Sequence, residues 1–267
     1  MNSKGEFLPS NTFRIERLVP GPIELVFDHF AKSELFSKWL MKCSIQPELG
    51  GLITLQVDPV PPGTHDTDQI EPHVCWIRGL INEFDPPHVL AFSWNESSYN
   101  AATHFKIELA ERDGQVHLVL THSHLNPEVM AAVAAGWHTH LESMIALVKG
   151  EEIPDFTKTF ERLLAEYRVI LAGASVVVVT ATATPAVASD LSSDAYKAVS
   201  THRQELLIKY DSVWKDADHL QSDINILERA NERDEKSIDI LYRDLKEKKD
   251  SLRKIELDIR DLDKVLS

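Results

Sequence analysis

The sequence predicts an α+β fold, in which one long helix lies over a curved antiparallel sheet, plus a long C-terminal α-helical coiled coil. Three observations support this prediction. Between residues 12 and 125, alternating apolar and polar residues are broken by turn signals, as in a series of strands. A helical apolar pattern follows at about 128–149. From residue 191 onward there is neither glycine nor proline, and apolar residues recur at alternating steps of three and four.

Length and composition restrict the class of protein. The 267 residues carry a formal net charge of −14, which argues against a nucleic-acid-binding protein because little would neutralise phosphates. Cys43 and Cys75 are the only cysteines, so we expect no disulfide framework, no zinc motif and a reducing, cytoplasmic location for the N-terminal domain. No metal or cofactor is expected. The first residues lack the apolar stretch of a signal peptide.

The N-terminal domain is expected over residues 12–168. TFRIERLV alternates like a strand, and PGPIELVFDHFAKSELFSKWL then turns helical, with Val26, Phe30, Leu35 and Trp39 near one face. Three strand pairs follow, around Gly50-Gly51, around Asp85-Pro86-Pro87 and around Asp113-Gly114. A helix that covers such a sheet leaves a groove in which ligands commonly sit.

Residues 169–189 contain no charged side chain. Twenty-one such residues are long enough to cross a bilayer, which predicts a single-pass membrane anchor or signal anchor. The alternative is a buried strand pair or an apolar linker, because Val, Thr and Pro185 are poor residues for a membrane helix. The segment 169–190 is therefore treated as a separate unit.

The remaining unit, 191–267, has the heptad pattern of a coiled coil. Because a lone helix cannot bury its apolar stripe, we expect residues 196–266 to pair with a second copy of the chain or with another coiled-coil protein. An antiparallel fold-back is the alternative, although no glycine or proline marks a turn. Polar residues interrupt the stripe and are expected to fix its register. The stripe consists of Leu206, Tyr210, Val213, Ala217, Leu220, Ile224, Leu227, Asn231, Asp234, Ile238, Leu241, Leu245, Lys248, Leu252, Ile255, Ile259, Leu262 and Leu266.

Four histidines are the candidates for chemistry. His122 and His124 continue the strand face of Val116, Leu118 and Leu120, and two histidines at this spacing can bind a metal with a third ligand. His138 and His140 lie about 200° apart on the later helix, so at most one could complete such a site. Lining of an apolar pocket is the favoured interpretation of these histidines.

An enzyme is the alternative to a binding protein. His122 or His138 in an apolar groove could act as an acid or base, because burial tunes the pKa of an imidazole. The sequence offers no Gly-x-Ser-x-Gly elbow, phosphate-binding loop or dinucleotide fingerprint. We expect three tryptophans, Trp76, Trp94 and Trp137, to be core residues. In this fold a core residue can also line a cavity for a flat, apolar molecule.

Several motifs resemble those of a known superfamily. GLINEFDPPHVLAFSW, FKIELAERDGQVHLVLTHSHL and AAGWHTHLESMIALVKG resemble a strand–turn–strand, a hairpin and a C-terminal helix of the START-like, or SRPBCC, helix-grip superfamily. The opening PGPIELVFDHFAKSELFSKWL is similar to that of the branch of activators of the ninety-kilodalton heat-shock-protein ATPase. The resemblance covers about residues 12–165, and superfamily members include lipid carriers, cyclases and hydrolases.

The resemblance implies a cavity beneath the helix that bears Gly136 and Trp137. It also implies that a chaperone is a further partner to consider beside an apolar, lipid-like small molecule. The apolar segment and the coiled coil are not usual in this family, which leaves open what they bind. The ligand-binding residues that the resemblance implies are Trp76, Trp94, Phe105, His122, Trp137 and Leu141.

Overall fold

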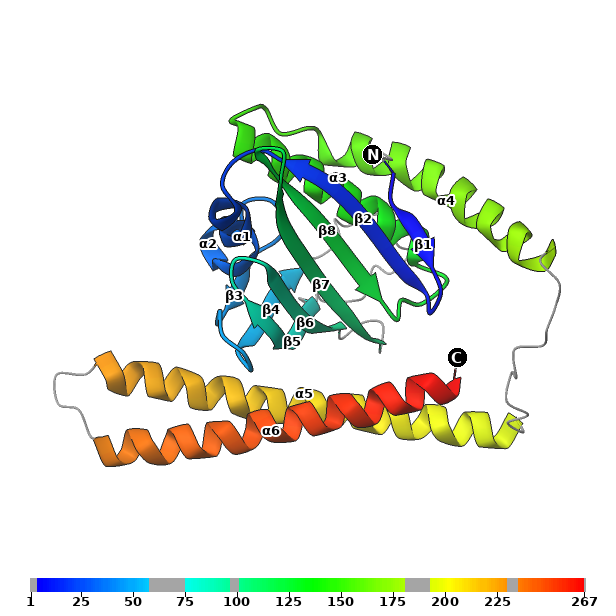
Figure 1. Cartoon of the computed structure of the whole chain (residues 1–267). Coiled ribbons are helices and arrows are strands. Elements are labelled where there is room, and N and C mark those ends of the chain that lie inside the picture. The colour runs from blue at the N-terminus through cyan, green and yellow to red at the C-terminus, as the bar shows by residue number, and fades with distance from the viewer. Residues whose placement is uncertain (1–3, 58–74, 97–100, 181–192, 230–234, 267) are drawn as a thin grey trace, which may run out of the picture. The chain divides into compact units, whose positions relative to one another are not determined.

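The computed structural model describes residues 4–57, 75–96, 101–180, 193–229 and 235–266 (Figure 1). The chain divides into two compact units, Met1–Ala186 and Val187–Ser267. The first unit holds the sheet and four helices, and the second holds two long helices.

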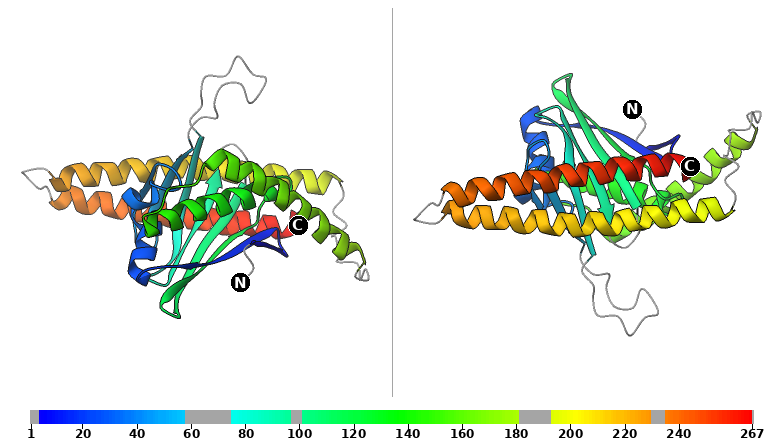
Figure 2. Two further views of the ribbon diagram at one scale, coloured as in Figure 1. Left: turned by 90° about the horizontal axis from the view of Figure 1, so that it is seen from above. Right: turned by 90° about the horizontal axis from the view of Figure 1, so that it is seen from below.

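An eight-stranded antiparallel sheet forms the body of the first unit, with the strand order β1-β2-β8-β7-β6-β5-β4-β3. The sheet is curved, as the fold class predicts (Figures 1 and 2). Its strands are β1 (Glu6–Leu8), β2 (Thr12–Val19), β3 (Cys43–Ile45), β4 (Leu52–Val57), β5 (Cys75–Asp85), β6 (Val89–Glu96), β7 (Ala101–Arg112) and β8 (Gln115–Ser123).

Two long helices complete this layer arrangement. Helix α3 (Met130–Lys149) lies across one face of the sheet, and α4 (Phe156–Thr180) packs against α3 (Figure 2). The main core lies between α3 and the sheet, where Phe92, Phe105 and Ile107 are fully buried. The predicted α+β helix-grip fold is therefore confirmed.

The entry helix is shorter than predicted. The pattern of residues 20–40 predicts one helical face. In the structure, α1 (Ile23–Ala31) ends before Lys32, whose backbone is extended (φ −103°, ψ 122°), and α2 (Ser33–Phe36) begins after it. Phe36 rather than Leu35 is buried as a result. The break is held in place because the Ser33 hydroxyl accepts a hydrogen bond from the Ile45 amide at 2.9 Å.

The predicted turns agree with the structure. Asp113 and Gly114 both have positive φ (52° and 73°), as the two central residues of a type I′ hairpin require. On β5, Gly79 meets β6 so closely that a Cβ built on it lies 1.7 Å from the Ser93 carbonyl oxygen. Glycine is therefore required at position 79 by the approach of the neighbouring backbone.

The apolar run at 169–189 is only partly described. Helix α4 includes its first twelve residues and ends at Thr180, and residues 181–189 lie outside the described part of the chain. None of the helices described is both long and apolar enough to serve as a membrane span. The sequence prediction also missed β1 and the amphipathic part of α4, whose buried residues include Leu163 and Tyr167.

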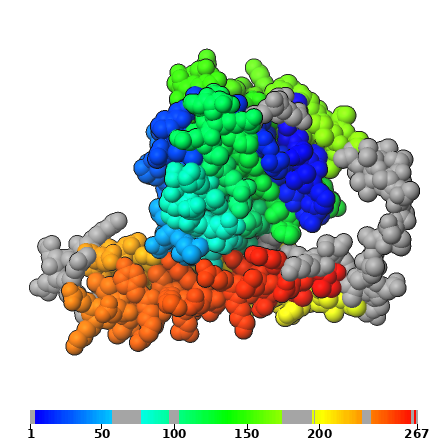
Figure 3. All heavy atoms as spheres, in the orientation of Figure 1, coloured from blue at the N-terminus to red at the C-terminus, as the bar shows by residue number. Residues whose placement is uncertain are grey.

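The second unit is an antiparallel pair of helices, α5 (Ser193–Arg229) and α6 (Glu235–Leu266). Two contacts between the helices show that they run in opposite directions. The Tyr210 hydroxyl donates to Glu256 at 2.8 Å, and further along α5 Asp216 lies 2.6 Å from Lys248, which comes earlier in α6. In Figure 3, α6 is the band of atoms that runs from orange to red.

This pairing changes the interpretation of the heptad stripe. Its members Ala217, Ile224, Leu245 and Leu252 are buried between the two helices of one chain, together with Trp214, which the stripe did not include. The fold-back that the sequence left as the alternative is the arrangement found, and a second chain is not needed to cover these residues. Asn231 and Asp234 lie outside the described residues.

Candidate functional site

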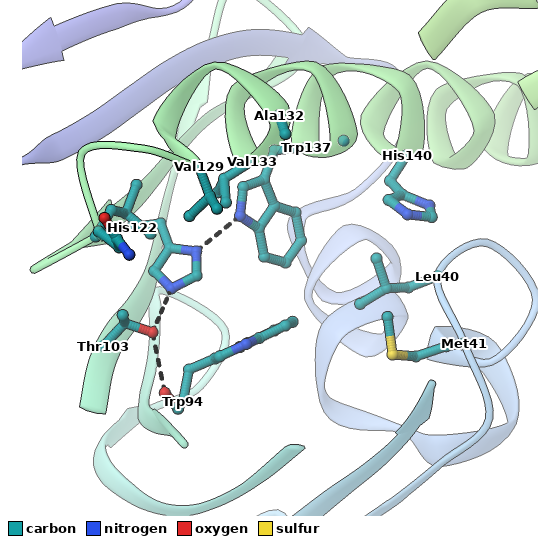
Figure 4. A pocket seen from close by; sticks show the side chains of 13 residues that line it. Leu40, Met41, Trp94, Thr103, His122, Val129, Ala132, Val133, Trp137 and His140 are labelled. Atoms are coloured by element: carbon teal, nitrogen blue, oxygen red, sulfur yellow. Dashed lines mark hydrogen bonds between the residues drawn. The ribbon is translucent and has the colours of Figure 1, made fainter. Parts of the chain in front are cut away.

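A cavity of about 290 Å³ lies beneath the first half of α3, next to the end of β8 and to the segment that follows α2 (Figure 4). This volume is at the lower end of the range of small-molecule pockets, about 300–1,000 Å³. The described lining contains no Asp, Glu, Lys or Arg. It consists of Leu40, Met41, Trp94, Thr103, His122, Leu125, Asn126, Val129, Ala132, Val133, Gly136, Trp137 and His140.

Two tryptophans form an aromatic wall. The rings of Trp94, on β6, and Trp137, on α3, meet edge to face, with centroids 5.4 Å apart and planes at 70°. Phe105, on β7, supports Trp137 from the core side at 5.0 Å. Trp94 is only 9% exposed and Trp137 only 4%. The wall is therefore fixed by packing and presents ring surface to the cavity.

A chain of hydrogen bonds joins α3 to the sheet at this wall (Figure 4). The Trp137 indole N–H donates to His122 Nδ1 at 2.9 Å. His122 Nε2 lies 2.7 Å from the Thr103 hydroxyl, which itself donates to the Trp94 carbonyl at 2.9 Å. Because an indole N–H can only donate, Nδ1 must be the accepting nitrogen, and Nε2 carries the proton that is donated to Thr103.

These bonds define the charge state of His122. Burial lowers the pKa of the His122 imidazole to about 3, with a smaller contribution in the same direction from His104. Protonation at Nδ1 would also place two donors, His122 and Trp137, face to face. The imidazole is thus neutral, and both of its nitrogens are already bonded. This geometry does not favour the hypothesis that His122 is an acid or base.

The buried neutral imidazole predicts a stability that falls in acid. Since the pKa of His122 is about 3 when folded and about 6.5 when unfolded, the unfolded state takes up the proton first as the pH falls. The contribution of the neutral His122 to the unfolding free energy is present above pH 6.5 and is lost as the pH falls from 6.5 to 3. From pH 7.5 to 5 we expect the preferential protonation of His122 in the unfolded state to lower the unfolding free energy by about 2 kcal/mol.

Urea unfolding of the wild type and His122→Gln at pH 7.5, 6.5 and 5 measures this contribution. Burial lowers the pKa of His138 and His140 as well, so both chains lose stability in acid, but the variant should lose less. Equal losses in the two chains would contradict the assignment of a neutral His122.

The structure brings together some of the predicted ligand-binding residues. Trp94, His122 and Trp137 line the cavity, whereas Phe105 and Leu141 are buried in the core behind it. Trp76 belongs to β5 by its backbone, and its side chain lies outside the described part of the chain.

The histidine pair on the strand does not share a site. His124 follows the end of β8, adopts positive φ (62°) and is exposed, whereas His122 is buried. Among the residues that the structure describes, no three His, Cys, Asp or Glu side chains are grouped so as to hold a metal ion.

His138 lies away from the cavity, between α3 and α4. Its Nε2 is 3.1 Å from Glu142, and its Nδ1 is 2.9 Å from the Tyr167 hydroxyl, which also accepts from the Gly5 amide at 2.9 Å. Burial lowers the pKa of His138 and raises that of Tyr167. With both nitrogens bonded, His138 anchors α4 and the N-terminal segment to α3.

Several cavity residues were not identified from the sequence. Leu40 and Met41 follow the α1–α2 break that the periodicity did not predict. Val129 falls within the predicted helix, 128–149, but the structure places it just before α3 begins at Met130. Tyr167 had a signal: with Phe160, Leu163 and Leu164 it follows the i, i+3, i+4, i+7 spacing of an amphipathic helix. His140 was interpreted with the other three histidines as pocket lining but was not among the predicted ligand-binding residues, and it does line the cavity.

Comparison with known proteins gives a family match within the first unit. Residues 20–149 match the sequence model of the family described as Activator of Hsp90 ATPase homolog 1-like protein. Comparison with curated protein sequences gives no match.

Solved structures from several species match part of this chain. A protein from Bordetella parapertussis, solved by solution NMR, is 30% identical; the match covers 61% of this chain and 88% of that one, with a TM-score of 0.48. CalU16 from Micromonospora echinospora is 16% identical, with 63% and 94% covered and a TM-score of 0.49. A protein from Rhodobacter sphaeroides is 20% identical, with 54% and 98% covered and a TM-score of 0.43.

Proposed function

Because this chain belongs, through residues 20–149, to the family of Activator of Hsp90 ATPase homolog 1-like proteins, we propose that it binds a compact, uncharged and mostly apolar molecule in the cavity beneath α3. The observation that carries the proposal is the cavity of about 290 Å³. Most of the described residues that line it are apolar, and two tryptophan rings form part of its wall.

The absence of charged side chains from the described lining supports the choice of an uncharged ligand. A charged group moved from water into such a site would lose its hydration without gaining an ion pair, at a cost of several kcal/mol. The hydrogen bonds of His122 give no support to catalysis by this residue, because neither of its nitrogens is left to accept a proton from a substrate.

Filling the cavity tests this function. Gly136 lies on α3 in the cavity wall, and a Cβ built there meets nothing within 4 Å. We expect Gly136→Leu to place its side chain in the cavity and to weaken binding of a bicyclic aromatic probe, naphthalene, at least tenfold. Helical folding should be retained, since leucine is favoured over glycine in a helix by about 1 kcal/mol.

Gly173→Leu is the matched control. Gly173 also lies in a helix, α4, with nothing within 4 Å of a built Cβ, and it does not line the cavity. Calorimetric titration with naphthalene should show binding to the wild type and Gly173→Leu, but much weaker binding to Gly136→Leu. No binding to the wild type, or equal binding to all three proteins, would contradict the proposal.

A further inference from the structure

One polar side chain of the cavity wall has a nitrogen available for a ligand. His140 extends from α3 toward Leu40 and Met41, at the end of the cavity away from His122 (Figure 4). Its Nδ1 lies 2.9 Å from the Trp39 carbonyl oxygen. A carbonyl only accepts, so Nδ1 carries the proton and Nε2 of the neutral ring carries a lone pair. Among the described residues, Nε2 has no hydrogen-bond partner.

The position of His140 is set by its surroundings. The ring packs against Phe156 with centroids 4.8 Å apart, and the bond to Trp39 holds it against the segment that carries Leu40 and Met41. Burial lowers its pKa, so the ring is neutral near pH 7 and Nε2 is an acceptor. The other polar groups differ: His122 is fully bonded, and Asn126 uses Oδ1 to accept the Glu128 amide at 3.0 Å, which leaves its NH2 group to donate.

From this arrangement we propose that the ligand is a neutral aromatic ring compound with a hydroxyl or N–H group, which packs against Trp94 and Trp137 and donates a hydrogen bond to His140 Nε2. The inference rests on the proposed function and specifies the chemical class of its ligand. His140 then acts as a specificity-determining residue, because it distinguishes compounds of the same shape by one donor.

The physical reason is the cost of an unsatisfied buried acceptor. In the empty cavity, Nε2 can be hydrated. A purely apolar ligand displaces that water and returns no hydrogen bond, whereas a hydroxyl-bearing ligand replaces it. Leaving a buried acceptor unsatisfied weakens binding by roughly one order of magnitude in the dissociation constant. We expect a preference of about tenfold for the donor-bearing compound.

The test compares three probes of nearly equal shape: naphthalene, 1-naphthol and 1-methoxynaphthalene. Dissociation constants at pH 7.5 are measured by calorimetry and by NMR titration of the tryptophan indole N–H signals. 1-Naphthol should bind the wild type about tenfold more tightly than naphthalene, and 1-methoxynaphthalene, which has the oxygen but no donor, should show no such gain. Equal binding of 1-naphthol and naphthalene overturns the inference and leaves the proposed function intact. Failure of all three to bind overturns both.

Two variants assign the preference to His140. His140→Phe keeps an aromatic ring next to Phe156 but removes the acceptor, so the ratio of the naphthalene and 1-naphthol dissociation constants should fall to about one. A ratio within one protein cancels any general loss of affinity that follows from the broken Trp39 bond. Met41→Leu, another change in the wall, should keep the wild-type ratio. Persistence of the preference in His140→Phe overturns the assignment.

Discussion

Trp137→Ala is expected to lower the free energy of unfolding by about 3–5 kcal/mol, the usual cost of removing a large buried aromatic side chain. Trp137 is 4% exposed and packs against Trp94, Phe105 and His122 at centroid distances of 5.4, 5.0 and 5.9 Å. The substitution also leaves His122 Nδ1 without its donor. The cavity wall and the bond between α3 and the sheet are lost together. Urea unfolding at pH 7.5 measures the change.

Trp137→Phe separates the two effects. Phenylalanine keeps a ring against Phe105 but cannot donate to His122, so we expect an intermediate loss of about 1–3 kcal/mol, dominated by the unsatisfied buried nitrogen. The same pair of variants can be followed through naphthalene binding, which should be weakest in Trp137→Ala. If Trp137→Ala lowered the unfolding free energy by less than 1 kcal/mol, the Trp137 side chain would not be packed in the core as described.

Gly79→Ala is expected to destabilise the sheet by about 3 kcal/mol or more, although it adds a single methyl group. The added Cβ would lie 1.7 Å from the Ser93 carbonyl oxygen and 2.8 Å from its carbonyl carbon. Both atoms belong to the backbone of β6 and cannot move aside as a flexible side chain could. The strands must separate locally, which also disturbs the hydrogen bond from the Leu80 amide to the Ser93 hydroxyl at 2.9 Å.

The matched control is Gly173→Ala, the same substitution where a built Cβ meets nothing within 4 Å. In the middle of α4 it should raise the unfolding free energy by up to about 1 kcal/mol, because alanine has the better helix propensity. Thermal and urea unfolding of both variants give the comparison. Gly79→Ala with wild-type stability would mean that β5 and β6 are not as close at this point as the structure places them.

Much of the fold could be predicted because its signals are local. Asp113-Gly114 marks the β7–β8 hairpin through the positive φ of both residues, and the alternation of Val116, Leu118 and Leu120 identifies the buried face of β8. The same alternation places His122 on that face. The periodicity of the entry helix failed at Lys32, because the pattern of apolar residues does not record a break that is held by the contact of Ser33 with β3.

The sequence by itself determined the α+β class, the three strand pairs and the strand face on which His122 lies, because backbone periodicity and turn chemistry act between near neighbours in the chain. Only the tertiary structure decided that the His122 nitrogens are occupied by Trp137 and Thr103, that His138 belongs to α4 and His140 to the cavity, and that α5 pairs with α6. These outcomes depend on strand register and on the placement of one helix against another. A heptad stripe shows that a helix needs a partner, but it does not distinguish a second chain from the continuation of the same chain.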